Sequence, residues 1–180
     1  MGRYSCRTAA RAVAAFLLAA AAASANVTVR FDPASVTINP GTIFSVAIVA
    51  DIPQPVVGWG LDLNIQNPAV VSVAAAPSIG PPWASAYAPD GDGLAALAFP
   101  SSVSGIGVVL ATLSLSADAV GETDLWISVT PGDLTEGFAL DPTGFDTFTV
   151  QPGHVKVPDP STIALLGLAA LGVALRRGRG

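Results

Sequence analysis

Cysteine and histidine are almost absent from this chain. Among its 180 residues, Cys6 and His154 are the only residues of their types. A disulfide needs two cysteines, and a histidine-rich transition-metal site needs several imidazoles, so neither can form. The stability of the protein must therefore come from burial of apolar side chains, alone or together with a bound metal.

Positive charge is also scarce between the two ends. From residue 26 to residue 157 the only Lys and Arg residues are Arg30 and Lys156, whereas all of the 13 acidic residues except Asp159 lie in this range. Such an acidic surface repels nucleic acid and anionic membranes, so we expect no nucleic-acid partner. The charge suits an extracellular module with a solubilising surface, or one that attracts calcium.

The N-terminal segment has the order of a secretory signal peptide. Arg3, Arg7 and Arg11 precede an apolar run over residues 12–23, and the run ends at Ala23-Ser24-Ala25. A basic region, an apolar core and a small-residue A-x-A site are what signal peptidase requires. We therefore predict a signal helix in residues 1–25, with Ala23 and Ala25 forming the cleavage site.

The C-terminal segment is apolar and ends in arginines. Residues 163–175 are apolar or glycine, which as a helix would span about 20 Å of a bilayer core about 30 Å thick. Flanking arginines anchor such a helix at the cytoplasmic face. We predict a transmembrane helix over 161–175. The anchoring residues are Ile163, Leu165, Leu166, Leu168, Leu171, Val173, Leu175, Arg176 and Arg177.

A short proline motif, Val157-Pro158-Asp159-Pro160, precedes this apolar run. Proline motif, apolar segment and arginine cluster in this order resemble the PEP-CTERM sorting signal of bacterial surface proteins, in which the motif is usually Val-Pro-Glu-Pro. Asp159 keeps the carboxylate but is one methylene shorter. The resemblance implies that residues 158–180 are a sorting signal, that an exosortase cleaves near the motif, and that the protein is anchored transiently before it reaches the cell surface or extracellular matrix.

Residues 26–157 have the pattern of one all-β domain. Apolar residues recur at every second position in short segments bounded by Gly, Pro, Asn and Asp, which is typical of a β-sandwich. Residues 59–66 are predicted to form one strand with Trp59 in the core. Residues 43–50 are apolar on both faces and predict a central strand covered on both sides. In the strand around Leu113, alternation places Val108 and Leu110 on the outer face.

Three segments of this domain resemble a cohesin-like domain: residues 31–46, residues 58–71, and residues 107–115 followed by Gly121-Glu122-Thr123. The resemblance implies a nine-stranded jelly-roll β-sandwich. It also implies a protein partner or, as in related carbohydrate-binding modules, a glycan. Fold alone does not choose between these ligands.

Asp90 and Asp92 form the one candidate metal site, for calcium. They lie two residues apart in an Asp-Gly-Asp-Gly turn, and carboxylate oxygens at this spacing can share a calcium ion. The same dipeptides are common in plain hairpin turns, so a solvated turn is the alternative. We expect no other cofactor.

Three aromatic residues are candidate ligand contacts. Trp83 and Tyr87 precede the aspartates, where flat rings beside carboxylates could grip a sugar, although Trp83 could equally pack on the end of the sandwich. Trp126 shares a polar strand face with Asp124, Ser128 and Thr130, which indicates either a contact surface or a face covered by a loop.

No catalytic residue is identified. No serine lies in a G-x-S-x-G context, and no pair of carboxylates is marked by its spacing as a glycosidase pair. We therefore expect a non-enzymatic surface or matrix module that binds a protein partner. A carbohydrate-binding module and a secreted hydrolase are the alternatives.

Overall fold

The computed structural model describes residues 26–83, 85–86, 94–98 and 100–159. Within these ranges the chain forms thirteen β-strands and no α-helix, so the all-β prediction is confirmed. None of the described residues belongs to a helix that could cross a membrane. The predicted signal helix, with Ala23 and Ala25, and the predicted transmembrane helix lie outside the described residues.

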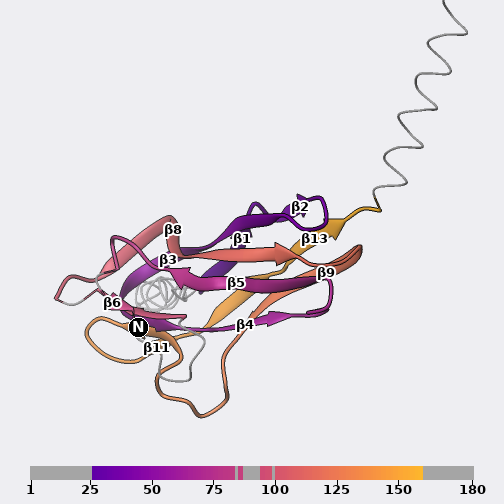
Figure 1. The fold of residues 1–180 in the computed structure, drawn as a ribbon. Coiled ribbons are helices and arrows are strands. Elements are labelled where there is room, and N and C mark those ends of the chain that lie inside the picture. The colour runs from indigo at the N-terminus through magenta and orange to yellow at the C-terminus, as the bar shows by residue number, and fades with distance from the viewer. Residues whose placement is uncertain (1–25, 84, 87–93, 99, 160–180) are drawn as a thin grey trace, which may run out of the picture.

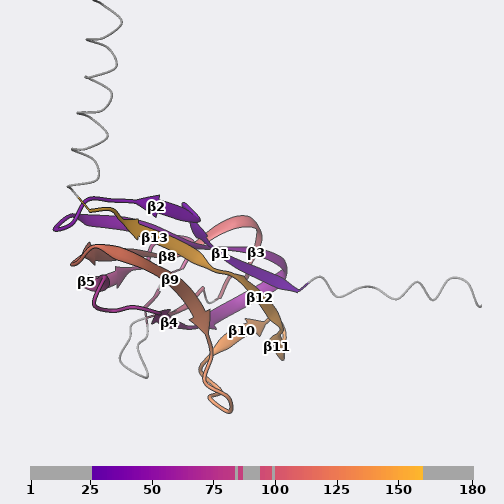
Figure 2. The same ribbon diagram turned by 90° about the vertical axis from the view of Figure 1, so that its right-hand side faces the viewer.

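The strands are β1 (Val27–Asp32), β2 (Ser35–Thr37), β3 (Ile43–Gly60), β4 (Asp62–Ile65), β5 (Val71–Ser78), β6 (Ser85–Ala86), β7 (Ala95–Leu97), β8 (Val103–Ala117), β9 (Gly121–Ser128), β10 (Gly137–Leu140), β11 (Phe145–Asp146), β12 (Phe148–Gln151) and β13 (Gly153–Val157). Nine of them form one sheet, in which β3 pairs with β1, β7, β8 and β10. The other four form a second sheet in the order β2-β13-β9-β4. Figures 1 and 2 show the two layers and the four strands of the second sheet side by side.

The core lies between the two sheets and draws on both. Val29 and Phe31 of β1 alternate inward as expected, and Leu125 and Ile127 of β9 meet them from the opposite layer. All four are almost completely buried. Burying a side chain of this size stabilises a fold by about 1.5–3 kcal/mol, so the core can hold the domain together without disulfides.

The strand predicted over residues 59–66 is in fact two strands. β3 ends at Gly60, and β4 begins at Asp62 in the other sheet. Leu61 lies between them, buried, and its backbone N–H donates to the carbonyl of Leu94 (2.9 Å). The alternating pattern continues across Leu61 because both strands cover the same core, which is why the sequence does not reveal the change of sheet.

The predicted faces of β8 are wrong at Leu110. This side chain is fully buried, whereas Val109 is exposed. The register between β3 and β8 pairs Ile48 with Ala111 and Val49 with Val109, so Leu110 is an extra residue in the ladder. A β-bulge of this kind reverses the alternation on one side of it, which no local pattern announces.

The structure has more strands than the nine that the cohesin resemblance implies. One division between strands is the change of sheet at Leu61, which separates β3 from β4. A further division falls at Pro152, which has no N–H to donate. The strand before it pairs with β1, and the strand after it pairs with β2 and β9.

The start of β3 is central but is not covered on both sides. It lies between β1 and β8, as predicted. Ile48, Val49 and Ala50 are buried, yet Ile43 is 67% exposed and Ser45 is exposed too. The expected two-sided burial therefore holds only where β3 passes the middle of the sandwich.

Two glycines of β3, Gly58 and Gly60, allow other segments to pack closely on its second half. A Cβ atom on Gly60 would overlap the carbonyl oxygen of Thr135 and lie 3.1 Å from the Cα of Glu136. Both obstacles are backbone, so neither can move aside by rotating a side chain. Gly60 thus lets the segment before β10 cross directly over β3.

We expect Gly60→Ala to lower the free energy of unfolding by about 1–3 kcal/mol, because overpacking must displace backbone. Gly80→Ala is the matched control, since a Cβ there meets nothing within 4 Å; its effect should stay within about 0.5 kcal/mol. Urea unfolding measures both. Equal stability of the two variants would show that the 130–136 segment does not lie on Gly60.

One ion pair ties three strands together. The guanidinium of Arg30 on β1 donates to the carboxylate of Asp51 on β3 (2.8 Å), and the same oxygen accepts from the N–H of Gly107 on β8 (2.7 Å). The Arg30 hydrogen bond, followed by the Gly107 N–H, lowers the pKa of Asp51 below its ordinary value of 3.8. Both side chains are partly exposed, so solvent screens the pair.

We expect Asp51→Asn to destabilise the fold by about 0.5–1 kcal/mol near neutral pH. A carboxyl whose folded pKa is depressed contributes its full stability above the unfolded pKa and loses it as the pH falls through the folded pKa. The difference between wild type and Asp51→Asn should therefore shrink below about pH 4. Urea unfolding across this range tests it; a difference that is independent of pH would contradict the assignment.

Candidate functional site

The outer face of the four-stranded sheet carries the most unusual exposed residue. Alternation along β9 buries Leu125 and Ile127 and turns Trp126 outward, where it is 48% exposed. Of the two alternatives for this residue, the described structure supports the open surface. Asp124 and Ser128 point to the same side, as the sequence predicts.

The neighbouring strand β4 supplies polar partners to this tryptophan. Asn64 lies directly opposite Trp126 in the register, and its amide donates to the hydroxyl of Ser128 (2.8 Å). Asp62, one pair further along, accepts from the hydroxyl of Thr130 (3.2 Å). These bonds fix the polar side chains beside the ring.

We call this surface the tryptophan face. It consists of Asp62, Asn64, Gln66, Asp124, Trp126 and Ser128, and with Ile65 and Pro152 most of it lines a shallow depression.

Side-chain hydrogen bonds between β13 and β9 border the tryptophan face. His154 and Asp124 are paired across the strands, with Nδ1 2.7 Å from the carboxylate. Lys156 donates to Glu122 (2.7 Å), and this hydrogen bond is the main reason that the pKa of Glu122 is lowered. All four side chains are about half exposed, so these pairs orient the carboxylates more than they stabilise the fold.

This arrangement offers groups suited to binding a ligand. Trp126 offers a flat apolar ring, and amide, hydroxyl and carboxylate groups surround it. The nearby carboxylates of Asp62, Glu122 and Asp124 exceed the fixed positive charge of Lys156, so the surface favours a neutral or basic ligand.

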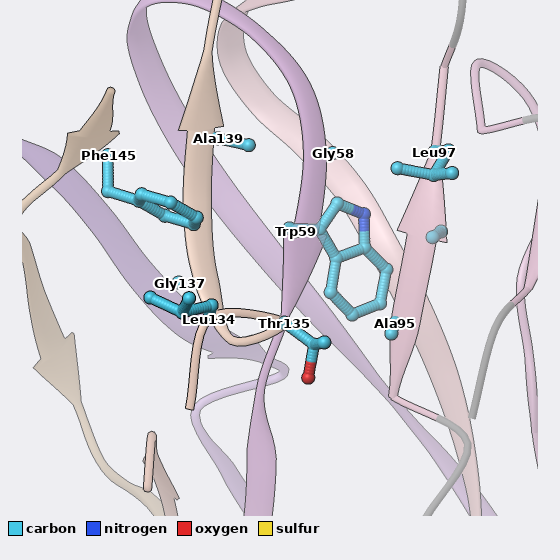
Figure 3. Close-up of a pocket in the computed structure, with 10 residues that line it drawn as sticks. Gly58, Trp59, Ala95, Leu97, Leu134, Thr135, Gly137, Ala139 and Phe145 are labelled. Carbon is cyan, nitrogen blue, oxygen red and sulfur yellow. The ribbon is translucent and has the colours of Figure 1, made fainter. Parts of the chain in front are cut away.

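A second, apolar depression lies on the nine-stranded sheet. The register places Phe145, Ala139, Gly58 and Leu97 in one row across β11, β10, β3 and β7, and Figure 3 shows this row with Trp59 beside it. Leu134 stands over the row and is 82% exposed. The depression encloses about 190 Å³.

The segment that carries Leu134 is held by its own polar residues. The Asp133 carboxylate accepts from the N–H of Thr135 (2.8 Å) and from its hydroxyl (2.6 Å), and the hydroxyl bond is the main cause of the lowered pKa of Asp133. Glu136 accepts from the N–H of Thr130. The wall of the apolar depression is therefore a folded loop.

Trp83 is a core residue, and the predicted sugar contact there is corrected. It is 3% exposed, its indole N–H donates to the carbonyl of Val109 (2.9 Å), and its ring meets Trp59 edge to face at 6.0 Å between centroids. Both rings are packed inside, so Trp83 has no open face for a ligand. Packing at the sandwich end, the other reading of this residue, is the observed one.

The remaining predicted site residues divide between described and undescribed parts of the chain. Tyr87, Asp90 and Asp92 lie outside the described residues, so the calcium site stays a prediction. The described ranges contain no group of three or more His, Cys, Asp or Glu that could hold a metal ion. Val157, Pro158 and Asp159 are at and just beyond the end of β13. Pro160 and the predicted anchor residues lie outside the described part.

Two features of these surfaces could not be identified from the sequence. The pairing of His154 with Asp124 depends on the register of β13 against β9, which spans thirty residues of chain. The apolar depression draws Leu134 from a polar loop and Phe145 from a two-residue strand. The one sign of this depression in the sequence is that Leu134 and Phe145 are each an isolated large apolar residue in a turn-rich segment.

The three tryptophans give a direct test of this placement. We expect acrylamide to quench the Trp126 emission strongly and the Trp59 and Trp83 emission weakly, because only the first is open to solvent. Trp126→Phe should remove most of the quenchable signal, whereas the control Trp83→Phe should leave it. A wild-type protein whose emission resists acrylamide would show that the tryptophan face is covered.

Comparison with known proteins adds a motif and a fold. Residues 156–179 match the family model of the PEP-CTERM protein-sorting motif, which confirms the predicted sorting signal. This motif indicates export, sorting to the cell surface and processing by an exosortase. No curated protein matches the chain significantly in sequence.

Two solved structures share the fold. A chain of the CaDoc0917–CaCohA2 complex superposes with a TM-score of 0.52 and 17% sequence identity, covering 73% of this chain and 99% of that one. The non-cellulosomal cohesin from the hyperthermophilic archaeon Archaeoglobus fulgidus superposes with a TM-score of 0.53 and 12% identity, covering 77% and 94%. The protein is thus a β-sandwich structurally similar to cohesin domains, with a PEP-CTERM sorting motif at its C-terminus.

Proposed function

We propose that this protein is an exported, non-enzymatic binding module that is displayed at the cell surface and binds a protein partner through the tryptophan face. The half-exposed Trp126 is the observation that carries the proposal. Large aromatic residues on otherwise polar surfaces are the commonest anchors of protein interfaces. The cohesin-like fold supports a protein partner, and one of the similar chains comes from a complex.

The charge of the tryptophan face narrows the partner. Asp62 and Asp124 belong to the tryptophan face, and Glu122, already paired with Lys156, lies further along β9. A partner that brings basic side chains to this rim would be steered toward it and would satisfy the carboxylates. We therefore expect binding to weaken as salt is raised, because exposed charges are screened.

A glycan is the second candidate ligand for the same face. An exposed indole beside Asn64, Gln66 and Ser128 can stack on a sugar ring while the amides and hydroxyls bind its hydroxyl groups. The surrounding carboxylates favour a neutral polysaccharide over an anionic one. In this case the module would hold cells in extracellular polysaccharide.

The sorting signal indicates where the protein would bind either a protein partner or a glycan. We infer that the C-terminal segment anchors the protein transiently in the membrane until an exosortase cleaves near Pro158, after which the domain reaches the surface or the matrix. The acidic character of the domain suits such an exposed position, since it keeps the protein soluble.

Capture experiments with Trp126→Ala test the proposal. The mature wild-type protein, immobilised, is incubated with extracellular proteins of the producing cells and with an array of neutral glycans. We expect the specific ligand to be bound at least about tenfold more weakly by Trp126→Ala, as for an interface anchor. Ile106→Ala is the matched control, since Ile106 is an exposed apolar residue on β8, away from this face.

The ligand whose binding is lost in Trp126→Ala identifies the function: a protein supports the first proposal, and a glycan supports the second. A ligand lost with both variants would indicate nonspecific apolar adsorption. If Trp126→Ala, with an unchanged melting temperature, retains every ligand of the wild type, the tryptophan face is not the binding site.

A further inference from the structure

The sorting signal and the folded domain overlap. The match to the sorting motif begins at residue 156, whereas β13 extends to Val157. Lys156 and Val157 therefore belong to both. Val157 is also the first residue of the proline motif, Val157-Pro158-Asp159-Pro160.

Val157 is part of the core. It is 1% exposed and pairs with Gly121 of β9. Gly121 leaves little room here, because a Cβ on it would lie 2.8 Å from Val70. The valine side chain is part of the buried core cluster and is not available to another protein.

The backbone just before Val157 is held on both edges. Lys156 pairs with Glu122 of β9 on one side and with Thr37 of β2 on the other. Its carbonyl accepts from the N–H of Ile38 (3.0 Å), and its ammonium is paired with Glu122. Beyond the last paired residue, Pro158 is partly exposed and Asp159 is exposed.

Enzymes that cut a peptide chain act on exposed segments, and a paired strand becomes available only when it opens. We propose that the processing enzyme reads this sorting signal only from Pro158 onward, and that Val157 serves the fold instead of recognition. The folded end of β13 then sets the N-terminal limit of the processing site. This inference rests on the sorting motif and is independent of binding at Trp126.

The covalent step is consistent with this limit. One peptide bond on the C-terminal side of Pro158 or of a later residue is broken, and the acyl group of the domain passes either to water, which leaves a carboxylate, or to an amine, which leaves an amide. The amino group released stays on the C-terminal fragment. In both cases all of β13 remains in the mature domain.

The mass of the mature protein, produced from the full chain in cells that contain an exosortase, gives the first test. We expect a C-terminal residue at Pro158 or later. A product that ends at Val157 or earlier would overturn the proposal, because its formation requires β13 to be read or cut. A product that keeps the whole tail would overturn it too, since the signal would then not be read at all.

Insertion of a short Gly/Ser linker gives the second test. Placed between Val157 and Pro158, the linker leaves β13 and the exposed part of the motif intact, so processing should be at least as fast as in the wild type. Placed between Pro158 and Asp159, it divides the exposed part, and processing should fall at least tenfold. If both insertions impair processing equally, the enzyme reads Val157 and the proposal fails. Failure here would leave capture through Trp126 unaffected.

Discussion

The backbone pairing of β3 is the constraint on which the other elements depend. The first part of this strand lies between β1 and β8, and its last three residues, from Gly58 to Gly60, lie between β7 and β10. One continuous strand thus aligns most of the nine-stranded sheet. Because it passes through Leu61 into β4, it also sets the position of the second sheet, and β4 in turn aligns β9 and places Asn64 opposite Trp126.

The two ends of the sandwich then acquire different surfaces. Around Gly58 and Gly60 the absence of side chains lets Leu97 and the 130–136 loop lie close over the sheet and form the apolar depression. At the other end, β13 closes the core with Val155 and Val157, where the sorting signal begins. The domain has no spacer there, so its folding and its processing share the same residues.

The local β-pattern could be predicted from the sequence, whereas the long-range pairing could not. Alternation along Val27–Asp32 and Gly121–Ser128 predicts the strands and the outward side of Trp126, because a period of two is a property of neighbouring residues. The bulge at Leu110, the change of sheet at Leu61 and the burial of Trp83 depend on partners that are distant in sequence. The apolar/polar alternation continues across Leu61, so it conceals the break between β3 and β4. The sorting motif was readable because it is linear.

We infer that the last strand of the domain is as firmly folded as its centre, even though the sorting signal begins within it. Native-state hydrogen exchange on the full chain tests this most directly, by comparing backbone amides of residues 153–157 with those of residues 46–50. We expect the hydrogen-bonded amides of both segments to exchange only through global unfolding, with similar free energies of opening. Exchange of the β13 amides at rates typical of unstructured chain, while β3 stays protected, would contradict it.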